Sequence, residues 1–340
     1  MIIFVLILGI LSFYKIRIRK DDSFLDSSDT LAINGIFIML VFFSHCEQYL
    51  YLPDSILNTL YLKFRDIHNQ LIVTSFLTFS GYGIMRQALA KGETYFKTFP
   101  RNRILKVIIN FDIAVLVYYI LLLLTKEQFG LLHILLSFIG YTSIGNSSWY
   151  IFAIVIIYVI VYVSYLVFKN NYYKIASLIT VGTIMYIIVL EYILKQEQWY
   201  FSTIMCFPFG VWIALFKDKI RVIISKKIFI MMISCLLGFV ATYKFRYNPW
   251  IMNIHSIMFM ALVIILLTKI KIGNKFLQYL GKNLFSIFIL QRIPMIILSY
   301  FDLFTTNMYM IFVFVALIAT FILSYLYNRY VPKIVDKIIQ

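Results

Sequence analysis

Apolar residues gather in long, uninterrupted runs along this chain, and short polar or charged segments separate the runs. A membrane-spanning helix needs about 20 consecutive apolar residues, and roughly 17 is the lower limit. We therefore predict an all-α fold, a polytopic transmembrane helix bundle of about eleven spans. The predicted spans are 1–16, 31–50, 71–90, 104–124, 149–168, 174–194, 199–216, 228–243, 251–268, 284–300 and 308–328.

One further apolar stretch runs from Leu131 to Ile144, between Gly130 and Gly145. It is about 14 residues long, which is too short for a span and typical of an interfacial or re-entrant segment. We expect it to enter the bilayer without crossing it.

The composition supports a membrane protein. The 340 residues are 62% hydrophobic and 14% charged, whereas soluble domains are about 45–50% apolar and about 25% charged. This difference excludes a water-soluble globular protein, a disordered chain and a nucleic-acid-binding domain. The expected partner is the lipid bilayer, with no nucleic acid.

The charges predict the orientation. The chain has 31 Lys and Arg against 15 Asp and Glu, a net charge of +16. If the 131–144 stretch does not cross, 24 of the 31 cations lie on one side, and this bias vanishes if it does cross. The positive-inside rule then predicts a multi-pass protein of the plasma or inner membrane, with its N-terminus outside and its C-terminus in the cytoplasm. Residues 1–30 are interpreted as an N-terminal anchor helix followed by a basic cytoplasmic segment.

The three cysteines, Cys46, Cys206 and Cys235, all lie in apolar segments and form no C-x-x-C pair. They are interpreted as buried thiols. We expect neither a disulfide framework nor a metal site.

Ionisable residues inside a span are energetically costly and often functional. His45 lies in the outer part of span 31–50, and its imidazole is suited to take up a proton near neutral pH. Glu47 follows two residues later. The alternative is an interfacial histidine that bonds to a neighbouring helix. Arg292 must find a carboxylate, a phosphate or water, and its functional and structural interpretations both stay open.

Other polar residues in or near the spans are weaker candidates. For Asn110 and Asp112 an interhelical hydrogen bond is favoured, and for His255 a place in the core. His68 and His133 could face a substrate.

A cytoplasmic cluster holds Arg101, Arg103 and Lys106 at the start of span 104–124. Arg103 and Lys106 are three residues apart and share a helix face. Cations at a helix N-terminus suit the phosphates of a nucleotide or coenzyme. The alternative is a plain anchor that follows the positive-inside rule.

Several motifs, taken in their order along the chain, carry a resemblance to a known family. They are Asn34-Gly-Ile-Phe-Ile-Met-Leu-Val-Phe-Phe-Ser-His45, Phe76-Leu-Thr-Phe-Ser-Gly-Tyr-Gly83, Arg103-Ile-Leu-Lys106, Asn146-Ser-Ser-Trp-Tyr150 and Leu290-Gln-Arg292. From about residue 31 to 330 the chain resembles the acyltransferase 3 family of integral membrane acyltransferases. Residues 31–340 would then form the acyltransferase domain.

The resemblance implies an O-acyltransferase that moves an acetyl group from cytoplasmic acetyl-CoA to a hydroxyl of an extracytoplasmic or lipid-linked glycan. The acceptor would be a capsular, exopolysaccharide or other envelope glycan. His45 would act as general base or as an acyl relay, and Glu47 would orient it. The expected donor-binding residues are Arg86, Arg101, Arg103 and Lys106. The expected acceptor-binding residues are Asn34, Ser80, Tyr82, Trp149, Gln291 and Arg292.

The chain departs from the family pattern at two positions. Asn34 stands where the family commonly has an Arg, and Lys106 replaces the second Arg of an Arg-x-x-Arg motif. Lysine keeps the charge but loses the planar fork of donors. A transporter or flippase for a lipid-linked glycan remains the alternative function, and the absence of an internal repeat argues weakly against it.

Overall fold

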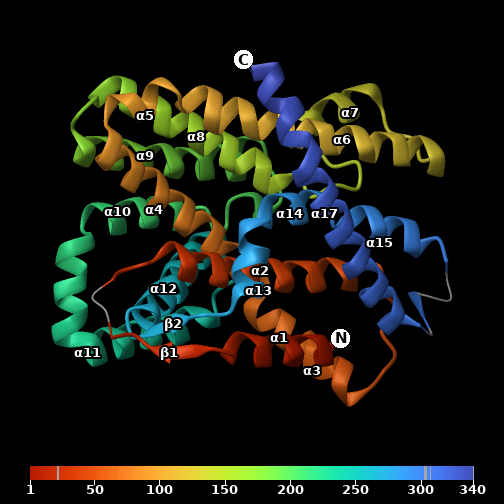
Figure 1. Cartoon of the computed structure of the whole chain (residues 1–340), viewed down its shortest axis with the longest axis horizontal. Helices are drawn as coiled ribbons and strands as arrows, with labels where there is room; N and C mark the ends of the chain where they lie inside the picture. The colour runs from red at the N-terminus through yellow and green to blue at the C-terminus, as the bar shows by residue number, and fades with distance from the viewer. Residues whose placement is uncertain (21–22, 302–304, 307, 340) are drawn as a thin grey trace.

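The structure of the chain is a computed structural model that describes residues 1–20, 23–301, 305–306 and 308–339. Figure 1 shows helices that run mostly along the long axis of the molecule. The regular secondary structure of the described chain is helical apart from one two-stranded antiparallel sheet, formed by β1 (Ile16–Ile18) and β2 (Ile270–Ile272). The prediction of an all-α helix bundle is confirmed.

Seven helices of the described chain are long and apolar enough to cross a membrane. They are α2 (Ser27–Glu47), η2 with α6 (Pro100–Leu105 and Lys106–Thr125), α8 (Trp149–Phe168), α9 with η3 (Tyr172–Ile188 and Val189–Ile193), α11 (Lys217–Tyr243), α12 (Pro249–Leu267) and α17 (Tyr309–Ile339). An eighth span is formed if α13 (Lys275–Lys282) counts with α14 (Leu284–Leu290) and α15 (Arg292–Ser299), across a bend of 63°. The chain is therefore a multi-pass membrane protein, but the predicted number of eleven spans is not confirmed.

Three predicted spans, 1–16, 71–90 and 199–216, are not among the helices that are long and apolar enough to cross a membrane. The first forms α1 (Ile2–Phe13), a helix of 12 residues, which covers only about 18 Å at 1.5 Å per residue. The third forms α10 (Cys206–Leu215), a helix of 10 residues that is almost wholly buried. The second forms α4 (Thr74–Lys91), whose buried face includes polar residues. Because α4 and α10 are enclosed by protein, they need neither the length nor the apolar surface of a lipid-facing span.

The two enclosed helices cross each other very closely. A Cβ added at Gly81 of α4 would lie 2.1 Å from the Phe207 carbonyl oxygen, and one at Gly210 of α10 would lie 1.9 Å from that of Thr78. No side chain fits at either distance, so glycine is required at both positions. This crossing holds α4 and α10 at the centre of the bundle.

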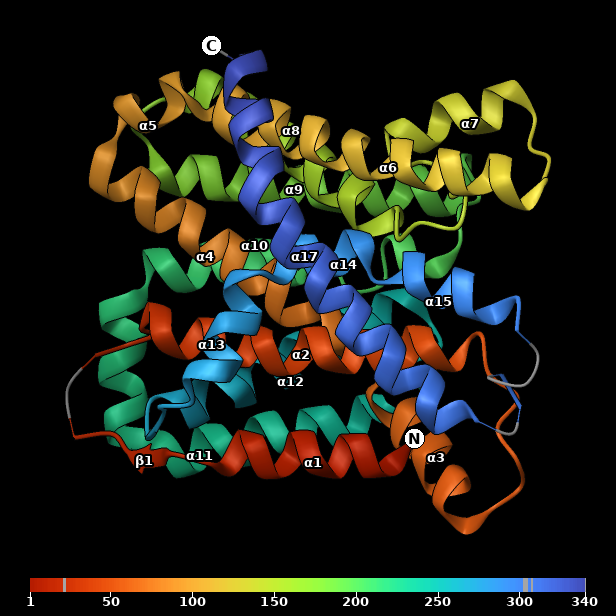
Figure 2. The ribbon, with the colours of Figure 1, turned by 45° about the vertical axis from the view of Figure 1, so that its right-hand side comes forward.

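The 131–144 stretch forms α7 (Leu131–Phe138), a helix of 8 residues. Both ribbon views place it beside the end of α6 (Figures 1 and 2). It is too short to cross, so the prediction that this stretch is not a span is confirmed.

The N-terminal segment packs onto the rest of the bundle. Its strand β1 pairs with β2 in the register Arg17 to Lys271. Arg19 then forms an ion pair with buried Asp29 of α2, and its Nε donates a hydrogen bond of 3.0 Å to the Leu267 carbonyl of α12. Residues 16–19 are thus tied to β2, to α2 and to α12.

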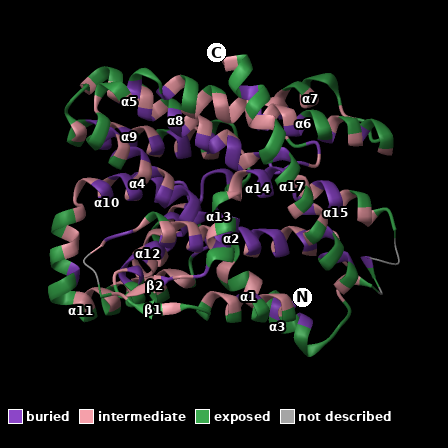
Figure 3. Cartoon of the chain, viewed as in Figure 1, coloured by how far each residue is buried: buried purple, intermediate pink, exposed green. Residues whose placement is uncertain are grey.

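Burial follows the arrangement of the helices. Figure 3 shows buried residues on the facing sides of the central helices and exposed residues on the outer sides. In α11, large apolar side chains such as Phe229, Leu237 and Val240 are more than 60% exposed. An outer surface of this kind suits hydrocarbon rather than water.

Candidate active site

A cavity of about 600 Å³ lies at the end of the bundle where α2 terminates. We call it the histidine cavity. It is lined by His45 from α2, Trp149 from the start of α8 and Arg292 from the start of α15. The structure therefore brings together three predicted site residues that are far apart in the sequence.

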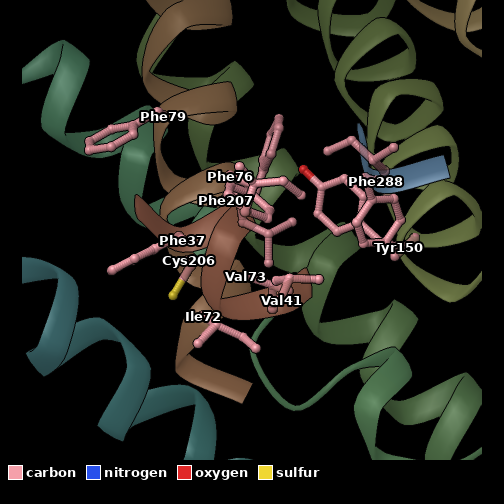
Figure 4. Close-up of a cluster of buried hydrophobic side chains, with 14 of the residues drawn as sticks. Phe37, Val41, Ile72, Val73, Phe76, Phe79, Tyr150, Cys206, Phe207 and Phe288 are labelled. Atoms are coloured by element: carbon pink, nitrogen blue, oxygen red, sulfur yellow. The ribbon is translucent and has the colours of Figure 1, made fainter. Parts of the chain in front are cut away.

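His45 is held in this cavity by packing. It lies in the last turn of α2, and its ring centroid is 6.4 Å from that of Phe288. Phe288 in turn packs edge-on against Tyr150, at 5.4 Å between ring centroids. Figure 4 shows these two rings together within the buried apolar cluster, with Val41 of α2 nearby. Among the described residues, His45 Nδ1 is buried without a hydrogen-bond partner.

Glu47 does not contact the imidazole. Its carboxylate forms an ion pair with Arg65 of α3 (Ile56–His68). Arg65 lines the histidine cavity, whereas Glu47 does not. The predicted orienting partner of His45 is thus engaged by another residue.

Arg292 bonds to neutral groups at the end of α2. Its Nη2 donates a hydrogen bond of 2.6 Å to Gln48 Oε1, and its Nη1 lies 3.5 Å from the Tyr49 hydroxyl. In the described part of the chain no carboxylate forms an ion pair with it. Its positive charge is therefore available to a ligand in the histidine cavity.

The loop before Trp149 supplies polar atoms that were not predicted individually. The Asn146 Oδ1 accepts a hydrogen bond of 3.0 Å from the Ile144 amide. Within the described chain, Asn146 Nδ2 and Ser147 Oγ are buried without partners, and both residues line the histidine cavity. A run of small polar residues directly ahead of an apolar helix is the signal that could have found them.

The segment between α9 and α10 adds Glu197 and Trp199 to the same cavity. Both residues were missed. Glu197 directly precedes the short 3-10 helix η4 (Gln198–Tyr200), and Trp199 lies within it. No spacing rule marks either of them as a site residue. Two tryptophans, Trp149 and Trp199, thus line one polar cavity.

A second cavity, of about 680 Å³, lies at the other end of the bundle. We call it the cationic cavity. Its walls come from α4, α5 (Glu93–Lys97), η2, α6, α14 and α17. Arg103 and Lys106 both line it, as the predicted pairing of these residues requires. The π-helical turn η2 precedes α6 and gives the chain a wider turn at Asn102 and Arg103.

Lysine 106 already has an anionic partner. Its Nζ lies 2.7 Å from Asp336 Oδ1 near the end of α17. A third cation, Lys91 of α4, also lines the cavity and was not predicted. Its signal in the sequence is the i, i+4 spacing of Gln87 and Lys91, which places both side chains on one face of α4.

The other two predicted donor-binding residues, Arg86 and Arg101, are exposed and do not line the cationic cavity. Both lie on the same elements as lining residues but face elsewhere. Of the four predicted donor-binding residues, only Arg103 and Lys106 therefore line the cationic cavity.

Four of the predicted acceptor-binding residues lie outside the histidine cavity. Ser80 bonds to the Tyr158 hydroxyl at 2.9 Å, and the Gln291 amide donates to the Phe288 carbonyl at 3.2 Å. Tyr82 is buried in α4. The Asn34 amide oxygen is buried in α2 with no partner in the described chain.

The weaker candidates are placed as follows. His255 is fully buried and stacks on Phe239. A hydrogen bond of 2.8 Å joins its Nδ1 to the Thr242 hydroxyl, which agrees with its interpretation as a core residue. His133 bonds the Ser143 carbonyl at 2.9 Å and so holds the loop of the histidine cavity. Asn110 lines the cationic cavity.

Helix α14 touches both cavities. Its Phe285 lines the cationic cavity and its Phe288 lines the histidine cavity. These residues are one helical turn apart, a rise of roughly 4.5 Å. The linings of the two cavities therefore come within one helical turn of each other on α14.

The fold and the two cavities define a multi-pass membrane protein with a cationic site at one end and a histidine site at the other. A family model described as an acyltransferase domain matches residues 32–329. The chain therefore belongs to the acyltransferase 3 family and is a membrane-type acyltransferase, as the sequence motifs predicted. No curated protein and no solved structure matches the chain at a significant level.

Proposed function

We propose that the protein is an O-acetyltransferase that moves an acetyl group from acetyl-CoA to a hydroxyl of an extracytoplasmic or lipid-linked glycan. The observation that carries this proposal is the pair of cavities that approach each other across one turn of α14. A donor and an acceptor can then bind from opposite ends and meet inside the membrane.

The cationic cavity suits the donor. Lys91, Arg103 and Lys106 supply positive charge for the phosphates of coenzyme A. Tyr95 and Phe99 offer apolar walls to the rest of the molecule. A volume of about 680 Å³ lies within the range of small-molecule sites. We assign this end to the cytoplasm, because most of the cations lie there.

The histidine cavity suits a polyhydroxylated acceptor. The unpartnered Asn146 and Ser147 groups can bond sugar hydroxyls, and Trp149 and Trp199 can cover the apolar faces of sugar rings. Because buried polar groups are costly without partners, these atoms gain most from a ligand that supplies hydroxyl groups.

In the proposed reaction His45 takes the proton of the acceptor hydroxyl. The oxygen attacks the thioester carbonyl carbon, the carbon–sulfur bond breaks, and the imidazolium returns the proton to the departing thiolate. The products are an O-acetyl ester and free coenzyme A. A relay through an acetyl-imidazole on His45 leads to the same products in two steps. Arg292 would stabilise the negative charge that develops on the carbonyl oxygen.

The proposal is tested by deleting the gene and complementing the strain with the wild type or with His45→Ala. The O-acetyl content of the purified envelope glycans is then measured by NMR. We expect acetylation to disappear on deletion, to return with the wild type, and to stay absent with the variant although the protein reaches the membrane. Full acetylation with His45→Ala would contradict the assigned base. Unchanged glycans on deletion would contradict the proposed acceptor.

A further inference from the structure

A third cavity, of about 290 Å³, lies beside the histidine cavity. We call it the side cavity. It is formed by the end of α6, the residues after α2, and α15. The side cavity and the histidine cavity share the 143–149 loop, since Ser143 lines one and Ile144 and Gly145 line the other. The two therefore open at the same end of the bundle.

One pair of side chains joins the linings of these two cavities. Arg292 lines the histidine cavity and Tyr49 lines the side cavity. Their contact, 3.5 Å from Nη1 to the hydroxyl, is at the limit of a hydrogen bond, and Arg292 Nε has no partner in the described chain. A ligand that bonds to either group could displace this weak contact and occupy both spaces.

The lining of the side cavity indicates what it would hold. The Tyr118 side chain is 1% exposed, and its hydroxyl has no hydrogen-bond partner among the described residues. Glu127 accepts a hydrogen bond of 3.1 Å from the Tyr300 hydroxyl. None of the described lining residues is a Lys or Arg. A described lining that holds the Glu127 carboxylate but no cation disfavours an anionic group. Its three tyrosines favour a ligand with both hydroxyls and apolar faces.

We propose that the side cavity is a second acceptor subsite, which holds the uncharged sugar unit next to the one that is acetylated. This inference rests on the proposed function. The acceptor chain passes Tyr49 and Arg292, with the reacting unit at His45 and its neighbour at Tyr118. The neighbour supplies the hydrogen-bond partner that the Tyr118 hydroxyl lacks, so the enzyme favours acceptors of at least two units.

The test compares two acceptors for the purified full-length protein in proteoliposomes with acetyl-CoA. Single sugars and one-repeat oligosaccharides are released from the envelope glycan of a strain that lacks the gene. For the wild type we expect kcat/KM to be roughly tenfold higher for the oligosaccharide. In Tyr118→Phe this ratio should fall by roughly three- to tenfold, the effect of one lost hydrogen bond to a ligand.

Tyr118→Phe keeps the ring and removes a hydroxyl that bonds to nothing in the described protein, so its thermal unfolding temperature should stay the same or rise slightly. Glu127→Gln should also lower the ratio, because it alters the partner of Tyr300. The matched control is Tyr192→Phe, whose side chain is 60% exposed and lies outside all three cavities; it should keep the wild-type ratio.

Equal kcat/KM for the two acceptors in the wild type would overturn the subsite, as would an unchanged ratio in Tyr118→Phe. Acetyl transfer would still be seen in both cases, so the proposed function would survive. Transfer to neither acceptor by the wild type would instead overturn the proposed function, and the subsite with it. A higher kcat/KM for the single sugar would show that the side cavity holds something other than the acceptor.

Discussion

The cationic cavity and the histidine cavity are built from the chain in different ways. Most residues of the first lie between 87 and 110, and α14 and α17 complete it. The second takes its lining from five separate stretches: 41–48, 65–73, 143–149, 196–200 and 288–292. A site made of neighbouring residues follows from local spacing, whereas a site made of distant segments needs the fold to bring them together.

The cavities also differ in charge. The first is lined by Lys91, Arg103 and Lys106. The second combines the cations Arg65 and Arg292 with the Glu197 carboxylate and the imidazole of His45. This contrast assigns phosphate binding to one end of the bundle and proton transfer to the other, and each end can be tested separately.

The largest effect is expected at the histidine. His45→Gln should lower kcat by roughly 10²- to 10⁴-fold, because a general base is lost. The dissociation constant for acetyl-CoA, measured by isothermal titration of the purified protein, should stay close to that of the wild type. A large loss of donor affinity in this variant would show that the two ends do not divide the work as proposed.

A smaller effect is expected at the donor end. The double substitution Arg103→Glu and Lys106→Glu should raise the KM for acetyl-CoA by roughly 10- to 100-fold, since charge-assisted hydrogen bonds to phosphate are lost. The KM for the acceptor should change little. Arg86→Glu with Arg101→Glu is the matched control, because these exposed residues carry the same charge but do not line the cavity. An equal effect of the control pair would reduce the site to a general basic surface.

Acid should destabilise the histidine end through His68, at the end of α3. Burial lowers the pKa of His68 to about 4. A hydrogen bond with the Phe64 backbone raises this pKa, and the positive charge of Arg65 lowers it further. The folded protein keeps this ring neutral, whereas the unfolded chain takes up a proton below about pH 6.5. Stability should therefore fall as the pH drops from about 6.5 towards 4.

His68→Asn should remove this part of the pH dependence, measured as thermal unfolding temperatures at pH 7 and pH 4.5. The difference between the two temperatures should shrink by several degrees, because a pKa lowered from 6.5 to about 4 corresponds to roughly 2 kcal/mol at pH 4.5. Arg103→Gln, at the other end, should show the wild-type difference. An unaltered pH dependence in His68→Asn would contradict the assignment.

The smallest effect concerns the anion that already pairs with Lys106. Asp336→Asn removes the carboxylate that competes with the donor for the Lys106 ammonium. In this ion pair the Lys106 side chain is 38% exposed and the Asp336 side chain is 57% exposed. Exposed ion pairs contribute about 0–1 kcal/mol, so the KM for acetyl-CoA should fall by at most about fivefold. A rise in this KM would show that Asp336 positions Lys106 for the donor instead of competing with it.

The number of spans shows where sequence reasoning stops. Hydropathy cannot distinguish a helix that is apolar because lipid surrounds it from one that is apolar because protein surrounds it. α10 is the second kind, with 10 residues held against α4 by the contact of Gly210 with the Thr78 carbonyl. α1, with 12 residues, also falls short of a span by itself.

The roles of Glu47 and Arg101 show the same limit for side chains. Glu47 is near His45 in the sequence, but its carboxylate forms an ion pair with Arg65, which α3 places beside it. Arg101 belongs to the basic cluster, but the π-helical turn leaves it exposed beside Arg103. Proximity along the chain therefore decided neither the partner of Glu47 nor the exposure of Arg101.

The sequence by itself determined that this is a helical membrane protein of the acyltransferase 3 family, because apolar runs, their separation by charges and ordered motifs are local properties. It also singled out His45, because an ionisable group is costly inside a span, and Arg103 and Lys106, because they share a face at a helix start. Only the tertiary structure decided which polar residues meet. Asn146, Trp199 and Tyr118 reach their cavities through helix packing between distant segments, and no local spacing encodes such contacts.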